Sequence, residues 1–171
     1  MDPVIAYFEQ AERLNEITQR VGFALWQLQE LEGLAATYFV LLAQAERGMG
    51  QEAGEILVAK AQGKTFGATI RQLEVAGLLT AELEQRFRKL LSERNWLVHS
   101  SRSDSRAVVH KSSEFAALLF RLDGIAEEAL ALLREVGALA ERQVISLGVS
   151  RRQIDIAAAT LLKKWHEADA I

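Results

Sequence analysis

Cysteine is absent from this chain, and proline occurs once among its 171 residues. Without thiols the protein forms neither disulfides nor thiolate metal sites, and this composition is compatible with a reducing cytosol. The N-terminal segment has neither the basic region nor the apolar core of a signal peptide, so we expect a cytoplasmic protein. The longest nearly apolar stretch, residues 33–43, is too short to span a bilayer, and we expect no membrane association.

The residues that are abundant favour helices along the whole chain. Alanine, leucine, glutamate, glutamine and arginine are strong helix formers, and no segment of useful length alternates as a strand does. We therefore expect an all-α protein in which residues 1–171 form a single-domain antiparallel helical bundle of about five to seven helices. The expected helices cover residues 3–19 and 21–47, either separate or joined, then 51–62, 66–76, 80–99, 112–147 and a last segment that begins after Ser150.

Turn and cap residues indicate where the expected helices begin and end. Asp2 is expected to cap the first helix, while Thr65 and Thr80 cap later ones. Ser150 with Gln153 forms the pattern of a capping box. The serine-rich segment 100–105 indicates a polar loop. Three sets of apolar residues are expected to face the core: Leu14 and Ile17; the periodic series in residues 112–147; and Ile154, Ala157, Leu161, Leu162 and Trp165 of the last helix.

Arg94 interrupts this apolar pattern. At about 100° per residue, its side chain leaves the helix within about 20° of Leu83, in the direction of the core leucines. Asn95 and His99 lie together on one flank of that stripe, because they are four residues apart. These three polar groups could border one cleft. The alternative is structural: Arg94 extends its charge to water or pairs with a buried carboxylate, and His99 caps the end of the helix.

The charge around Arg94 has the opposite sign to the rest of the chain. Residues 86–111 contain seven basic and two acidic residues, a net charge of +5, whereas the whole chain carries −3. Such a segment predicts a local positive field of the kind that attracts phosphate. A solvated basic surface next to a loop is the simpler interpretation, and the inward Arg94 favours the phosphate site.

Other ligand motifs fail on their spacing. Gly63-Lys64-Thr65 ends like a phosphate-binding loop, but Val58 occupies the position of the required glycine and the preceding segment is helical. The three histidines do not combine with carboxylates in the Glu-x-x-His pattern of helical di-iron proteins. We therefore expect neither a metal site nor a bound cofactor.

The segment Arg94-Asn95-Trp96-Leu97-Val98-His99 resembles the motif of the HEPN superfamily. In that family an arginine, usually followed by a polar residue such as asparagine, precedes a histidine with four to six residues between them, on a helix of a small all-α domain. The lead-in at residues 63–73 is similar to that of bacterial members, so the resemblance covers mainly residues 63–102. One position differs: some toxin members carry a tyrosine two residues after the histidine, where a nucleotidyltransferase modifies it, and this chain has Ser101.

The resemblance implies a metal-independent endoribonuclease that forms a homodimer with two copies of the motif in one cleft. His99 would then act as general base on the ribose 2′-hydroxyl, since its ordinary pKa of about 6.5 suits proton transfer at neutral pH. Arg94 would hold the scissile phosphate, and Asn95 would orient a phosphate oxygen or His99. Arg102 would add a phosphate contact and Trp96 could stack on a base. The product would carry a 2′,3′-cyclic phosphate.

The family also implies a biological setting and leaves alternatives open. RNA is the expected substrate, and a toxin or defence role in bacteria would bring an antitoxin or nucleotidyltransferase as partner. The first alternative is a non-catalytic helical module that binds a nucleotide, RNA or a protein in the same cleft. The second is an interaction scaffold with residues 112–147 as its contact surface.

Overall fold

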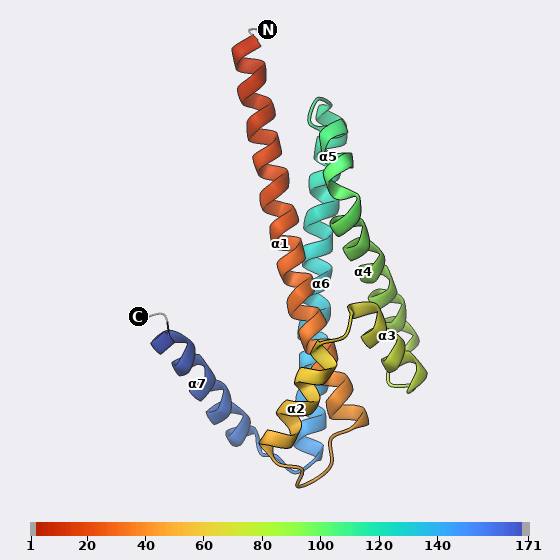
Figure 1. Cartoon of the computed structure of the whole chain (residues 1–171), viewed down its shortest axis with the longest axis vertical. Coiled ribbons are helices and arrows are strands. Elements are labelled where there is room, and N and C mark those ends of the chain that lie inside the picture. The colour runs from red at the N-terminus through yellow and green to blue at the C-terminus, as the bar shows by residue number, and fades with distance from the viewer. Residues whose placement is uncertain (1–2, 169–171) are drawn as a thin grey trace.

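Seven helices make up residues 3–168, which are the part of the chain that this computed structural model describes (Figure 1). No strand interrupts them within that range, so the expected all-α helical bundle is confirmed. In chain order the helices are α1 (Pro3–Ala43), α2 (Gln51–Gln62), α3 (Phe66–Val75), α4 (Ala81–His99), α5 (Ser101–Val108), α6 (Ser112–Ser146) and α7 (Arg151–Ala168).

The predicted caps begin the helices where they were expected. Thr65 accepts a hydrogen bond from the backbone N–H of Ala68, and Thr80 accepts one from Leu83, each satisfying a donor in the first turn. Ser150 and Gln153 form the reciprocal capping box at the start of α7. The cap expected at Asp2 lies outside the described residues.

Two long helices, α1 and α6, form the most extensive contact in the bundle and run in the same direction (Figure 1). Arg13 bonds to Ser112 and Arg20 to Asp123, pairs that are 99 and 103 residues apart, and such a nearly constant separation marks parallel helices. Alanines at the contact let the two backbones approach closely, because they add little volume. The fully buried residues of this contact include Ala24, Leu28, Leu31 and Ala35 of α1 and Leu122, Ala129, Leu132 and Val136 of α6.

Helix α4 completes the bundle by running antiparallel to both. Its contacts with α6 pair Arg86 with Glu128 and Glu93 with Arg121, so residue numbers rise on α4 as they fall on α6. Phe87 is fully buried and meets Phe66 of α3 edge to face, with the ring centroids 6.1 Å apart. Helices α2 and α3 pack against α1. Because α3 also contacts α4, it holds α4 against the bundle.

Helix α1 is continuous, so the two expected segments at 3–19 and 21–47 are joined, and the helix ends at Ala43 rather than near residue 47. Gly48 and Gly50, with φ of 87° and 80°, form the turn that follows. Ile17 is buried as expected, but the expectation for Leu14 is wrong, since that side chain is 48% exposed. The first turns of α1 extend past the ends of α5 and α6, so no described helix covers that part of α1 (Figure 1).

The polar loop expected at residues 100–105 is wrong, because that segment forms α5. Ser101 and Ser105 turn inward, and their hydroxyls donate to the carbonyl oxygens of Leu97 and Ser101, each at 2.5 Å. Short hydroxyl side chains satisfied within the helix in this way can be buried without loss of hydrogen bonds. The serines therefore allow a tight helical turn where their composition predicted a loop.

The prediction that the apolar residues of α7 face the core is also wrong. Trp165 is 60% exposed and Leu161 and Leu162 are about half exposed, because α7 points away from the bundle after Gly148, whose φ is 100° (Figure 1). An ion pair between Arg151 and Glu141 ties its first turn to α6. The capping box determines where α7 begins, whereas its apolar face has no covering helix among the described residues.

Two phenylalanines allow a matched test of this core. Phe87→Ala removes a fully buried ring and leaves a cavity, so we expect a loss of about 3–5 kcal/mol of unfolding free energy. Phe120→Ala removes a ring that is 82% exposed, and we expect a change within about 0.5 kcal/mol. Urea unfolding followed by circular dichroism measures both. Equal losses for the two variants would contradict this packing.

Candidate functional site

Helix α4 turns its apolar stripe and Arg94 toward the bundle and α1, whereas Asn95 and His99 lie on an exposed flank of the helix. Leu83, Phe87, Leu90 and Leu97 are buried as its apolar stripe requires. Val98, which the helical spacing places at the edge of the same stripe, is 49% exposed instead. The end of α4 is therefore only partly covered by α1, and the polar residues beside Val98 are accessible.

Arg94 forms an ion pair with Glu32 of α1. Its Nε donates to Oε1 of Glu32 at 3.1 Å, and the two side chains are 33% and 25% exposed. Arg94 thus pairs with a carboxylate, which is one of the structural interpretations raised by the sequence. The carboxylate of Glu32 is half-buried rather than buried. The inward direction of Arg94 is explained by this contact across the antiparallel α1–α4 pair.

Asn95 and His99 are exposed one helical turn apart on α4. Neither side chain forms a hydrogen bond or ion pair with another described residue. His99 lies in the last turn of the helix, where a cation is favoured by the dipole. The C-cap itself is Ser100, whose backbone N–H donates to the carbonyl of Trp96. His99 is therefore available to solvent and to a ligand.

Trp96 belongs to a different set of contacts. Its indole N–H donates to Asp104 of α5 at 2.7 Å, and the guanidinium of Arg121 from α6 stacks on the ring at 3.6 Å from the centroid. Arg121 in turn pairs with Glu93 at 2.8 Å. This network joins three helices, so Trp96 stabilises the top of the bundle, and its hydrogen bond and covered ring face limit stacking on a base.

Arg102 lies on α5 beside α1 rather than in a loop. It borders a cavity of about 280 Å³ together with Leu14, Thr18 and Val21 of α1. Arg106, one turn later, borders the same cavity and also the next one, of about 350 Å³, which includes His110. Sequence reasoning missed Arg106 as a site residue because it placed the segment before it in a loop. The i, i+4 spacing of the two arginines was the signal that a helix would align them.

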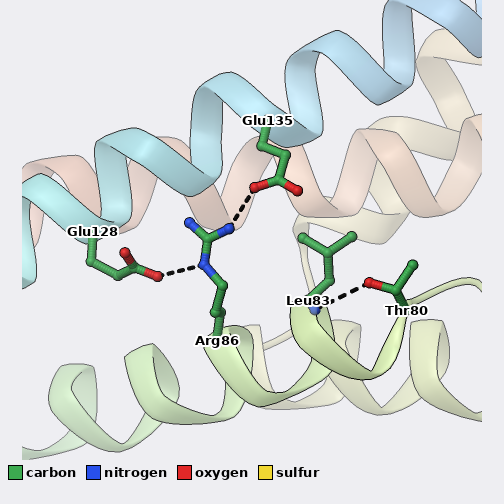
Figure 2. A network of polar contacts seen from close by, with 5 residues as sticks. All are labelled: Thr80, Leu83, Arg86, Glu128 and Glu135. Carbon is green, nitrogen blue, oxygen red and sulfur yellow. Dashed lines mark hydrogen bonds and ion pairs between the residues drawn. The ribbon is translucent and has the colours of Figure 1, made fainter.

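The positive field predicted for residues 86–111 is largely neutralised by acidic residues elsewhere. Figure 2 shows Arg86 between Glu128 and Glu135 of α6, at 2.7 Å and 2.5 Å. The hydrogen bond that it donates to Glu128 is the main reason that the pKa of Arg86 is raised. The other basic residues of this segment with carboxylate partners are Arg88, Arg94 and Lys111.

Arg102 and Arg106 differ from these paired residues. Both are exposed, and neither forms an ion pair within residues 3–168. An arginine fork without a carboxylate retains its full capacity for a phosphate oxygen. The cationic part of the site is therefore concentrated on α5, next to the end of α4 that carries His99.

No family model, curated protein or solved structure matches this chain. The HEPN resemblance therefore stays a prediction from residues 63–102. Within the described part of the chain, no three His, Cys, Asp or Glu side chains gather as a metal-binding group. None of the helices in that part is long and apolar enough to cross a membrane.

A double-mutant cycle tests the contact between Arg94 and Glu32. Arg94→Gln, Glu32→Gln and the double variant are expected to give a coupling free energy of about 0.5–1 kcal/mol, the range for partly exposed ion pairs. Urea unfolding at low salt measures it, and added salt should reduce it. Lys89→Gln combined with Glu32→Gln serves as the control and should show no coupling. A coupling of zero for Arg94 would contradict a stabilising contact with Glu32.

Proposed function

We propose that this chain is a HEPN-type, metal-independent endoribonuclease whose Arg/His site is completed by a second copy of the chain. The observation that supports it most directly is the exposure of Asn95 and His99 one turn apart on α4, beside the half-buried Arg94. Exposed polar residues at the spacing of a catalytic motif are available for substrate, and neither side chain is engaged by another described residue.

Arg94 is suited to hold the scissile phosphate. Glu32 engages its Nε, which sets the direction of the planar guanidinium and leaves the two terminal amino groups as the fork for phosphate oxygens. Those donors would stabilise the negative charge that develops when the 2′-oxygen attacks. Glu32 is thus a positioning residue in this proposal, since it acts on substrate only through Arg94.

His99 would remove the proton of the ribose 2′-hydroxyl, and Asn95 would orient a phosphate oxygen or His99 itself. The 2′-oxygen then forms its bond to phosphorus as the bond to the 5′-oxygen of the next nucleotide breaks. The products are a 2′,3′-cyclic phosphate and a 5′-hydroxyl that regains a proton. Arg102 would hold a neighbouring phosphate, for which its free guanidinium is available.

The cellular role within this proposal is that of a cytoplasmic bacterial toxin or defence ribonuclease, with an antitoxin or nucleotidyltransferase as partner. Modification at the position two residues after His99 has little support. Ser101 occupies that position, and it is buried with its hydroxyl donating to Leu97. A partner would therefore regulate the protein by binding it rather than by modifying this residue.

A non-catalytic RNA-binding module is the second candidate, and the ion pair between Arg94 and Glu32 favours it. An arginine that is already neutralised contributes less to transition-state charge than a free one. In this case the unpaired Arg102 and Arg106 would supply the affinity, and Asn95 and His99 would supply polar contacts to the RNA.

Cleavage of RNA in excess chelator tests the leading proposal. We expect the parent protein to cut mixed RNA, and His99→Ala to lower the rate at least about 100-fold, the usual contribution of a general base. Arg94→Ala should lower it by about 100- to 1,000-fold through lost charge stabilisation. Gel analysis of labelled RNA, with detection of 2′,3′-cyclic ends, measures both.

Matched controls separate these roles from general effects. His166 is an exposed histidine on α7 and Arg88 is an exposed arginine on α4, so His166→Ala and Arg88→Ala should retain the parental rate. Cleavage by the parent that survives both site substitutions would overturn the assignment of Arg94 and His99. Binding without cleavage by the parent would support the second candidate.

The salt dependence of RNA affinity tests the role of α5. Each phosphate contact on single-stranded RNA contributes about 0.7 to the slope of log affinity against log salt. We therefore expect Arg102→Gln with Arg106→Gln to reduce that slope by about 1.4, as measured by fluorescence anisotropy. Lys163→Gln with Lys164→Gln removes two exposed charges from α7 and should leave the slope unchanged. An unchanged slope for the arginine variant would exclude α5 from the RNA interface.

A further inference from the structure

A groove runs between the first half of α1 and α5. It consists of two adjoining cavities of about 350 and 280 Å³, and Leu14 and Arg106 border both of them. Arg13 of α1 donates a hydrogen bond of 3.0 Å to the carbonyl oxygen of Val109, which holds the end of α5 against α1. We call the hollow formed by these two cavities the α1–α5 groove.

The two walls of the α1–α5 groove differ in chemistry. The wall from α5 carries Arg102 and Arg106 one turn apart, and the exposed His110 follows after four more residues. The wall from α1 is uncharged, and it includes the exposed side chains of Tyr7 and Leu14. Among the described residues, no aspartate or glutamate borders either cavity. A ligand that fits this groove is therefore anionic along one side and apolar or aromatic along the other.

We propose that the α1–α5 groove binds a single-stranded polynucleotide, with its phosphates on α5 and its bases against α1. The inference rests on the proposed function in taking RNA as the natural ligand. It goes further by assigning a surface that holds the strand outside the catalytic residues, since neither Arg94 nor His99 borders the two cavities. The surface is complete within one copy of the chain, so it does not depend on a dimer.

The spacing of the basic residues favours a strand over a ligand with a single anionic group. Arg102 and Arg106 are about 6 Å apart along the helix axis, because each residue of a helix rises about 1.5 Å. This rise is comparable with the distance between neighbouring phosphates in an extended single strand. Each guanidinium can thus hold its own phosphate, whereas a fatty acid would leave one arginine without a counterion.

The uncharged wall favours a single strand over a duplex. Tyr7 is 70% exposed and borders the larger cavity, so a base can stack on its ring. Leu14 lies further along the same wall and offers an apolar surface to the next base. A duplex keeps its bases stacked inside and would present mainly sugar and phosphate to both walls. An unpaired strand instead presents phosphates to one wall and the faces of its bases to the other.

Neither kind of contact requires a 2′-hydroxyl. Phosphate groups and base faces are available in both RNA and DNA, so a DNA strand should also occupy the groove. DNA cannot react in the proposed cleavage, because that reaction begins at the 2′-oxygen. Single-stranded DNA therefore probes the groove separately from the ribonuclease.

Fluorescence anisotropy with a labelled oligothymidylate of about eight nucleotides, at low salt, tests the aromatic wall. Tyr7→Ala should raise the dissociation constant at least about fivefold, which corresponds to the loss of one stacked base. Phe8→Ala is the matched control, because Phe8 is the neighbouring aromatic residue of α1, is 62% exposed and borders neither cavity. It should keep the parental affinity. Equal affinities for the two variants would overturn the assignment of α1 as the base wall.

A carboxylate placed inside the groove gives the second test. Leu14→Glu should raise the dissociation constant for the oligothymidylate at least about tenfold, because the new charge neutralises Arg106 and repels phosphate. Phe23→Glu adds the same charge to an exposed position of α1 that borders neither cavity, and it should change the affinity less than about twofold. Both positions are about half exposed, so both variants should keep the parental circular dichroism spectrum. Equal losses of affinity would contradict a localised groove.

The remaining outcomes separate this proposal from the catalytic one. A parent that does not bind the oligothymidylate, or that binds a DNA duplex or an acidic peptide equally well, would overturn the strand as occupant of the groove. DNA binding by a parent that leaves RNA intact would retain the groove and sink the ribonuclease. RNA cleavage by a parent without affinity for the DNA strand would do the reverse.

Discussion

The parallel contact between α1 and α6 is the constraint on which the rest of the bundle depends. Two helices that run in the same direction need a connection that returns the chain to its starting end, and α4 provides most of that return (Figure 1). The helix that carries the candidate site is therefore also the helix that closes the fold. Its inner face is used for packing, so a functional residue on α4 has to lie at the border with α1 or on an outer flank.

The arginines divide in the same way, between those that hold helices together and those that remain free at the surface. Arg86 and Arg88 are neutralised by carboxylates of α6 and of α3 and α4, so they contribute to the assembly of helices. Arg94 is intermediate, since Glu32 contacts one edge of its guanidinium at the α1–α4 border. Arg102 and Arg106 have no carboxylate within the described residues. This gradient from paired to free arginines runs toward the end of α4 where His99 is exposed, which is the direction expected for a phosphate-binding surface.

Much of the fold could be predicted from local patterns. Helices α3, α4 and α7 begin at the predicted caps Thr65, Thr80 and Ser150, because a side-chain cap depends only on residues within one turn. Predictions that depended on contacts between distant segments were less reliable. Leu14 and Trp165 have the periodicity of core residues, yet both are exposed, since periodicity shows that a face is apolar and does not say which element covers it.

For the candidate site, the sequence by itself determined that Arg94 points toward the core side of α4 and that Asn95 and His99 share a flank, because the spacing of residues on a helix has no other solution. Only the tertiary structure decided that Glu32 neutralises Arg94, that Asp104 and Arg121 engage Trp96, and that Arg106 joins Arg102 beside α1. Each of these contacts joins side chains from different helices, and their distances are set by how the helices pack. Local sequence carries no information on that packing beyond the apolar faces that have to be covered.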